Sequence, residues 1–354
     1  MPPLEAWGWS PVWEERFAAF AGDGRQPGRV LREDRRQMLV AVAAGDCEAH
    51  VAGRLIHTAT AREAWPAVGD WVALARAEQG RGARIEAVLP RTSRFVRRAV
   101  ADGNRTEEQV LAANVDTIFL VAGLNEDFNP RRLERYLTAA WDSGARPVVL
   151  LNKADLCHDI EAAIDAISAA AVGVPIHSLS AATGAGLEAL APYLGRGQTV
   201  VFLGSSGVGK STLINRLLGE ARQAVREIRA YDGRGRHTTT AREMLALPEG
   251  GLVIDTPGLR ELELWDDGEG VDHVFADIAA LAEECRFRDC QHGSEPGCAV
   301  LAAVAAGELD PRRLESFHKL QREQAMLAIR KEQRARLGYG TTKYSMKRLR
   351  RYRR

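Results

Sequence analysis

The sequence predicts a multidomain protein with an N-terminal β-barrel, a central α/β domain that carries a phosphate-binding loop, and a C-terminal α-helical domain that binds a metal ion. Three observations predict it: short apolar runs at regular spacing, strands that alternate with helices, and a tight group of cysteines with one histidine. The 354 residues suffice for two or three domains, each with its own core.

The barrel is predicted for residues 28–100. Residues 28–97 contain five runs of apolar and β-branched residues, separated by turn residues, at a spacing of about ten to fifteen positions. Five such strands fit an OB-fold, although their spacing alone does not separate it from an SH3-like barrel. Residues 1–27 form an extension with three tryptophans, to which the sequence assigns no role.

The central α/β domain is predicted for residues 108–265. Here VDTIFLVAG precedes the helical pattern PRRLERYLTAAWDSG, and PVVLLNKAD precedes DIEAAIDAISAAA. Strands and helices in alternation imply a mostly parallel, doubly wound sheet with helices on both faces. Ligands of such sheets bind at the carboxyl ends of the strands, and the motifs described below lie there.

The strongest motif is a phosphate-binding loop between a strand and a helix, where GSSGVGKS matches GxxxxGK[ST] in full. Its glycines let backbone N–H groups face the phosphates, and the following helix adds its dipole. Lys210 would meet the β and γ phosphates, Ser211 would bind Mg²⁺, and Thr212 would lie near the α-phosphate. The predicted loop residues are Gly204, Ser205, Ser206, Gly207, Val208, Gly209, Lys210, Ser211 and Thr212.

The tetrapeptide NKAD, after the strand PVVLL, predicts that the base is guanine. The Asp155 carboxylate can accept from both N1–H and the N2 amino group of guanine, whereas adenine would leave the charge unpaired. Asn152 would tie the loop to neighbouring backbone, and the Lys153 stem would cover one face of the base. The predicted base-binding residues are Asn152, Lys153, Ala154, Asp155, Ser180 and Ala181, the last two offering backbone N–H to guanine O6.

Two further segments are expected to respond to the γ-phosphate. The strand GLVI ends in DTPG, where Asp255 would hold Mg²⁺ through water and the Gly258 N–H would meet the γ-phosphate. Upstream, GRGRHTTT ends in three hydroxyl residues. One of these threonines would complete the Mg²⁺ shell, and Thr239 is favoured.

The predicted catalytic residues are His237, Lys210 and Thr239. Leu259 follows DTPG where a Ras-like GTPase has its water-orienting glutamine. Leucine cannot orient water, so we expect slow hydrolysis by the protein alone. His237 is the best local group to orient or deprotonate the water, and the alternative is an exposed histidine without a role.

The order of the motifs differs from that of a Ras-like GTPase. NKAD and the dipeptide SA precede the phosphate-binding loop, which indicates a circularly permuted chain. The segment after DTPG therefore leads directly into the cysteine group, and a nucleotide-driven change would be coupled covalently to the C-terminal domain.

A zinc site is predicted in a helical domain over residues 270–335. Its ligands, spaced C-x4-C-x-H-x5-C, are Cys285, Cys290, His292 and Cys298. Three thiolates and one imidazole complete a tetrahedral shell without an open position, so the Zn²⁺ would be structural. Cys47 and Cys157 are expected to be unpaired.

Charge is distributed unevenly, although 48 basic and 47 acidic residues give a net charge of only +1. Residues 330–354 hold eleven Lys or Arg and one acid, so this end carries +10 and the preceding chain −9. The basic tail, 336–354, suits nucleic-acid phosphates, and about the last fifteen residues are expected to be flexible until bound. The sequence shows neither a membrane-spanning stretch nor a signal-peptide pattern, so we expect a cytoplasmic protein.

The joint presence of these motifs resembles the bacterial ribosome small-subunit-dependent GTPase A family (RsgA, also called YjeQ). The resemblance rests on NKAD, SA, GSSGVGKST, GRGRHTTT, DTPGL and CRFRDCQHGSEPGC, in that order, and covers residues 28–330. It implies an OB-fold, a permuted GTPase domain and a zinc domain, in a monomer that assists late maturation of the 30S subunit. It further implies binding to 16S rRNA, hydrolysis of GTP to GDP stimulated by the subunit, and a catalytic role for His237.

Two other interpretations of the sequence remain. A metabolic P-loop enzyme, such as a kinase with a metal knuckle, would need a second small-molecule pocket with an acid or base, which the sequence does not show, and NKAD favours guanine. A passive RNA-binding module would use GTP only for stability. Substitution of Ser211 would separate this module from a nucleotide switch.

Overall fold

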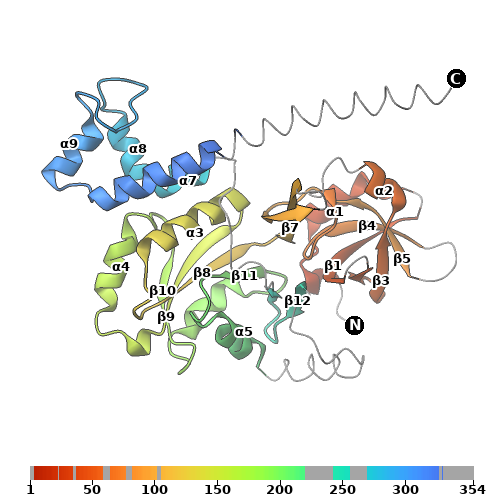
Figure 1. The fold of residues 1–354 in the computed structure, drawn as a ribbon. Helices are drawn as coiled ribbons and strands as arrows, with labels where there is room; N and C mark the ends of the chain where they lie inside the picture. Colours follow the sequence, from red (N-terminus) through yellow and green to blue (C-terminus); the bar gives the residue numbers. More distant parts are fainter. Residues whose placement is uncertain are drawn as a thin grey trace, which may run out of the picture. The chain divides into compact units, whose positions relative to one another are not determined.

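The computed structural model describes residues 4–22, 24–34, 37–58, 64–76, 82–101, 105–219, 242–255, 269–326 and 329. The chain divides into two compact units, Met1–Glu263 and Leu264–Arg354 (Figure 1). The barrel and the α/β sheet belong to the first unit, and the cysteine group belongs to the second.

Five strands close into a barrel at the start of the first unit. Their order is β1-β2-β3-β5-β4, and β1 also pairs with β4. Strands β3 and β5 run parallel, while the other neighbours run antiparallel, as in an OB-fold. The predicted barrel is therefore confirmed. Its strands are β1 (Gln26–Asp34), β2 (Gln37–Val42), β3 (Gly45–Val51), β4 (Trp71–Arg76) and β5 (Ala83–Val88).

Aliphatic side chains fill the barrel, and the fully buried ones include Val30, Val40, Val72, Leu74 and Ile85. Gly28 is required in this core, because a Cβ there would overlap the side chains of Val40 and Leu74. One of the five predicted runs, EAHVAGRL (48–55), is a strand only in its first half, because β3 ends at Val51 and helix α2 (Gly53–Thr58) follows. Leu55 of this helix packs against the barrel core, which explains why this position is apolar although it is not in a strand.

The N-terminal extension packs against the barrel as two short helices, η1 (Leu4–Trp7) and α1 (Pro11–Ala18). The ring of Trp9 lies 4.8 Å from that of Trp71 in β4, in an edge-to-face arrangement. Leu4 and Phe17 are buried in the same cluster. The extension is therefore part of the packed structure.

A mostly parallel sheet follows, as predicted. The strands β10-β9-β8-β11-β13 are parallel neighbours, and β12 adds an antiparallel strand. They are β8 (Thr117–Gly123), β9 (Arg146–Asn152), β10 (Ile176–Ser178), β11 (Thr199–Leu203), β12 (Arg242–Ala246) and β13 (Leu252–Asp255). The hairpin of β6 (Arg94–Ala101) and β7 (Arg105–Ala113) spans the predicted gap between barrel and α/β domain.

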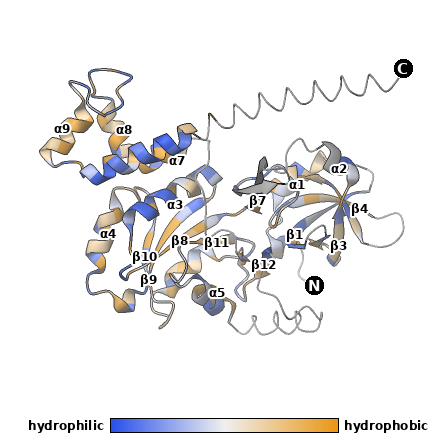
Figure 2. Cartoon of the chain, in the orientation of Figure 1, coloured by the Kyte–Doolittle hydropathy of each residue, from blue (hydrophilic) through white to orange (hydrophobic). Residues whose placement is uncertain are grey.

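Helices cover both faces of this sheet (Figure 1). Phe119 and Val121 of β8 pack in one core with residues of α5 (Lys210–Leu218). The alternating residues Ile118 and Leu120 are equally buried and point to the opposite face, which α3 (Pro130–Ser143) covers. Helix α4 (Ile160–Ser168) packs beside α3. Figure 2 shows the central strands in largely hydrophobic colours and much of α3 as hydrophilic.

One sheet connects the barrel with the α/β region. Strand β12 pairs antiparallel with β1, which places Arg242 opposite Glu33 and Glu243 opposite Arg32. Ion pairs of 2.9 Å (Arg242 to Glu33) and 3.7 Å (Arg32 to Glu243) join the same strands. The result is a single eleven-stranded sheet.

The second unit is helical, as predicted. It contains α7 (Glu269–Val274), α8 (Ala276–Ala282), α9 (Ala299–Ala306) and a helix over residues 311–326. Arg313 donates to both carboxylate oxygens of Asp277, at 2.6 and 2.7 Å, and lies over the ring of Phe275. A bidentate pair of this kind fixes the last helix against α8.

The sequence spaces Leu314, Phe317, Leu320, Met326 and Ile329 as a narrow apolar stripe on the last helix, but the structure buries only part of it. Leu314, Phe317 and Leu320 are buried, but Met326 is 61% exposed and Ile329 is 55% exposed.

Among the described helices, none is both long enough and apolar enough to span a bilayer.

Candidate nucleotide site and metal centre

The three loops expected to bind a nucleotide meet at the carboxyl ends of the parallel strands. Asn152, the last residue of β9, is only 1% exposed. Its amide nitrogen donates to the Val208 carbonyl at 2.7 Å, and its amide oxygen accepts from the Ala181 N–H at 2.8 Å. One side chain thus joins the NKAD loop to the phosphate loop and to the SA loop. Both partners are backbone groups, as the sequence analysis expected.

The rest of the NKAD loop faces outward. Lys153 adopts a left-handed conformation, φ +64°, and its stem lies beside Gly123 at the end of β8. Ala154 begins the turn η3 (Ala154–Leu156), and its N–H donates to the Leu179 carbonyl at 3.1 Å. The Asp155 carboxylate is exposed and has no hydrogen-bond partner within the described part of the chain. It is therefore available to a base.

The SA loop is held from two sides. The Ser180 hydroxyl accepts from the Thr183 N–H at 3.1 Å, and Ser180 is buried. From α5, the Arg216 guanidinium donates to the Ala181 carbonyl at 2.5 Å and to the carbonyl of Ala182. Sequence analysis missed Arg216, because it acts on backbone carbonyls and belongs to no motif.

The phosphate loop has the backbone shape that its glycines allow. Gly207 and Gly209 have φ values of +80° and +102°, and a Cβ at Gly209 would collide with the Asn152 amide. Lys210 begins α5, and its ammonium donates to the carbonyls of Gly204 at 2.5 Å and of Ser205 at 2.6 Å. The exposed or partly exposed residues of the motif are Ser205, Ser206, Gly207, Gly209, Lys210, Ser211 and Thr212.

The residues expected to sense the γ-phosphate are described only in part. Asp255 is the last residue of β13. This strand pairs with β11, the strand that leads into the phosphate loop. The predicted positions His237, Thr239 and Gly258 lie outside the described residues.

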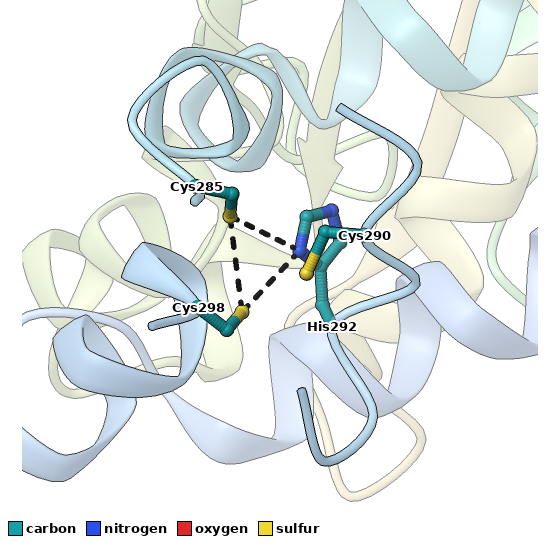
Figure 3. A group of neighbouring side chains, drawn as sticks. All are labelled: Cys285, Cys290, His292 and Cys298. Carbon is teal, nitrogen blue, oxygen red and sulfur yellow. Dashed lines mark hydrogen bonds between the residues drawn. The ribbon is translucent and has the colours of Figure 1, made fainter. Parts of the chain in front are cut away.

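The four predicted zinc ligands converge in the second unit (Figure 3), where their ligand atoms all lie within 4.8 Å of one another. The sulfurs of Cys285 and Cys298 are 3.8 Å apart, and each lies 3.5–3.7 Å from Nδ1 of His292. A tetrahedral Zn²⁺ with the usual bond lengths would require separations of about 3.8 Å between sulfurs and about 3.5 Å between sulfur and nitrogen. The side chains present therefore fit the ion.

The protonation of the group also suits a cation. Burial opposes ionisation of the Cys285 thiol, yet hydrogen bonds from the backbone N–H groups of Ala299 and Val300 and from the thiols of Cys298 and Cys290 together outweigh it and lower its pKa. Burial raises the pKa of Cys290 to about 11, with a contribution from the neighbouring sulfurs. Adjacent thiols cannot all ionise without a compensating charge, which a metal ion would supply. Burial lowers the pKa of His292, so its ring is a neutral ligand.

Glu295 shapes the loop between the ligands, a role that the sequence analysis missed. Its carboxylate accepts from the N–H groups of Gln291, Gly293 and Ser294 at 2.8–3.1 Å. Backbone donors, its own N–H included, lower its pKa to about 2. The carboxylate therefore stays charged and holds the turn around His292.

Comparisons with known proteins give a consistent result. A family model described as RsgA GTPase matches residues 88–265. A relative from Opitutus terrae, named small ribosomal subunit biogenesis GTPase RsgA, is 52% identical over 336 residues, covering 92% of this chain and 91% of its own. A relative of the same name from Streptomyces coelicolor is 48% identical over 337 residues, covering 94% and 90%.

Two solved structures share the fold. Thermotoga maritima YjeQ superimposes with a TM-score of 0.62 at 27% identity, covering 85% of this chain and 99% of that one. YloQ, described as a circularly permuted GTPase, gives a TM-score of 0.59 at 23% identity, covering 86% and 96%.

Proposed function

The chain belongs to the RsgA GTPase family, and on that premise we propose that it binds the small (30S) ribosomal subunit and assists its late maturation. It hydrolyses GTP to GDP and phosphate, and the subunit accelerates this reaction. The single observation that carries the proposal is the joining of three nucleotide loops through Asn152, in a chain whose relatives are named for small-subunit biogenesis.

The described loops supply a guanine nucleotide site. Asp155 accepts from the Watson–Crick edge of guanine, and the Lys153 stem covers the base. The N–H groups of Ser180 and Ala181, which were expected to meet guanine O6, already donate in the structure to the Ala185 carbonyl and to the Asn152 amide oxygen. The Lys210 ammonium binds the β and γ phosphates. Its acceptors in the structure are two carbonyls of the phosphate loop, those of Gly204 and Ser205.

The residues that would hold Mg²⁺ are the Ser211 hydroxyl, the Asp255 carboxylate through water, and Thr239. When bound, the ion neutralises charge on the phosphates. The N–H of Gly258 detects the γ-phosphate. His237 orients the attacking water, because Leu259 replaces the glutamine that would otherwise do so, and contact with the ribosomal subunit assists His237 in this role.

The zinc centre is structural in this proposal, because its four protein ligands leave no open position. It fixes the turn between Cys285 and Cys298 in the helical unit. The protein acts as a cytoplasmic monomer, and its barrel, zinc unit and basic tail (336–354) contact the subunit and its 16S rRNA.

A nucleotide switch and a passive RNA-binding module differ in one measurable property. Co-sedimentation with purified 30S subunits should depend on whether GDP or a non-hydrolysable GTP analogue is present. Ser211→Ala should abolish this dependence, because it removes a Mg²⁺ ligand near the γ-phosphate. Ser168→Ala, at an exposed position of α4 away from the nucleotide loops, serves as the control. Equal binding in both nucleotide states by the unsubstituted protein would favour the passive module.

A further inference from the structure

Arg132 lies beside the phosphate loop, although no motif in the sequence marks it. It belongs to the first turn of α3, which begins at Pro130 after the N-cap residue Asn129. The Asn129 side chain accepts from the Arg132 N–H at 3.2 Å and fixes this turn. Helix α3 follows β8, the neighbour of β9 and β11. Its first turn therefore lies at the edge of the sheet where the nucleotide loops meet.

The Arg132 side chain makes two polar contacts. Its Nη1 donates to the Ser205 hydroxyl at 2.5 Å and to the Asp127 carboxylate at 3.0 Å. The contact borders a cavity of about 10 Å³, also lined by the end of β8 and by Val208. That space holds about one water molecule, so the guanidinium is packed against the loop.

In the proposed nucleotide site, Ser205 would lie at the end of the loop that receives the γ-phosphate. The Lys210 ammonium donates to the Ser205 carbonyl at 2.6 Å, and a lysine in this motif meets the β and γ phosphates. Ser205 is therefore held twice: Lys210 binds its carbonyl and Arg132 binds its hydroxyl. A shift of Ser205 would therefore displace the carbonyl to which the Lys210 ammonium donates.

We propose that Arg132 is a positioning residue for GTP: through Ser205 it holds the γ-phosphate end of the phosphate loop, and Lys210 with it, in the arrangement that accepts a triphosphate. The inference rests on the proposed nucleotide site. Asp127 orients the guanidinium, whose planar donor set can serve a carboxylate and a hydroxyl at once.

The test is binding of fluorescent GDP and of a fluorescent non-hydrolysable GTP analogue, with Mg²⁺ and without ribosomes. Arg132→Ala should weaken the GTP analogue about tenfold, the size of one charged hydrogen bond, and GDP by less than about threefold. Arg132→Lys should restore part of the loss. Arg131→Ala removes the same charge from an exposed neighbouring position on α3 and should leave both affinities unchanged.

A second pair of variants tests the route through Ser205. Ser205→Ala should reproduce the selective loss, and the double variant should lose no more than either single one, because the two residues act through one bond. Additive losses, equal loss of both nucleotides, or no loss in Arg132→Ala would overturn the proposal. If the unsubstituted protein bound neither nucleotide, the proposed nucleotide site itself would fail, and the role of Arg132 would fail with it.

Discussion

At the scale of single residues, Asn152 connects the loops that are expected to bind the nucleotide. A side-chain amide both donates and accepts, and Asn152 uses both functions, on Val208 and on Ala181. An aspartate could not donate to the Val208 carbonyl. The base loop and the phosphate loop are therefore fixed to each other before a nucleotide arrives, which reduces the ordering that binding requires.

Asp155 should decide which base is bound. In Asp155→Asn the amide would donate where guanine also donates, so GTP affinity should fall at least about a hundredfold, the loss of two charged hydrogen bonds. Xanthosine triphosphate carries a carbonyl at that position and should become the better substrate. Phosphate release from GTP, XTP and ATP measures the change.

Asp159→Asn is the matched control for this substitution. Asp159 caps α4 by accepting from the Ala162 N–H at 2.9 Å, and asparagine caps equally well. Its nucleotide preference should equal that of the unsubstituted protein. Retention of GTP preference by Asp155→Asn would remove Asp155 from the base site.

Two arginines that hold the nucleotide loops were not predicted from the sequence, because their contacts belong to no motif. NKAD and GSSGVGKS could be recognised because chemistry requires those residue types at that spacing. Arg132 holds the phosphate loop through the Ser205 hydroxyl, at a position that the motif leaves open, and Arg216 holds the SA loop through backbone carbonyls, which any residue offers. No residue pattern marks such contacts. Only the fold brings α3 and α5 to these loops.

At the scale of elements, the strand between residues 26 and 34 joins the barrel to the α/β region. Arg29 of β1 is buried and donates to the Gly69 and Asn114 carbonyls, to the Thr199 hydroxyl at 2.9 Å and to the carbonyl of Trp7. Burial lowers its pKa to about 10, partly offset by Asp116 and Asp70, so it stays charged at neutral pH. One side chain thus connects four segments.

Arg29→Ala should destabilise the first unit strongly. It leaves several buried acceptors without donors, a change that costs roughly 3 kcal/mol or more. Urea unfolding followed by tryptophan fluorescence would report it, since Trp71 lies beneath the guanidinium. Arg196→Ala, at an exposed position, should change stability by less than about 0.5 kcal/mol. Equal stability of the two variants would refute the role assigned to Arg29.

The zinc group should stabilise the helical unit alone. Cys290→Ser removes one ligand, so bound zinc should fall below one per chain and the unit Leu264–Arg354 should unfold at lower temperature. GDP binding should persist, because the described nucleotide residues belong to the other unit. Zinc analysis and calorimetry measure both effects. Cys157→Ser, outside the group, should retain the metal, and full zinc content in Cys290→Ser would contradict the assigned ligand set.

Strand periodicity predicted both sheets but not their union. Each strand of the barrel and of the parallel sheet shows its own apolar pattern, whereas the pairing of β1 with β12 joins segments more than two hundred residues apart. Nothing local specifies that register. Met326 and Ile329 show that periodicity can also predict too much. Their helical spacing predicts burial on an apolar stripe, but both side chains are exposed in the structure.

At the scale of the whole molecule, the uneven charge predicts that the C-terminal end contributes to the proposed binding of ribosomal RNA. Residues 330–354 carry +10, although they lie outside the described residues. Deletion of residues 340–354 should flatten the dependence of 30S binding on salt, by roughly one unit of log–log slope for each phosphate that these residues neutralise. A full-length variant with glutamine in place of each Lys and Arg of this segment should behave the same. An unchanged slope would show that the tail does not bind the RNA.

The central claim is that this GTPase depends on the small subunit, and hydrolysis with purified subunits tests it most directly. We predict slow GTP turnover by the protein alone, at least about tenfold faster turnover with 30S subunits, and no acceleration with 50S subunits. His237→Ala should bind GTP normally and lose the acceleration. Equal rates with and without 30S subunits would contradict the account.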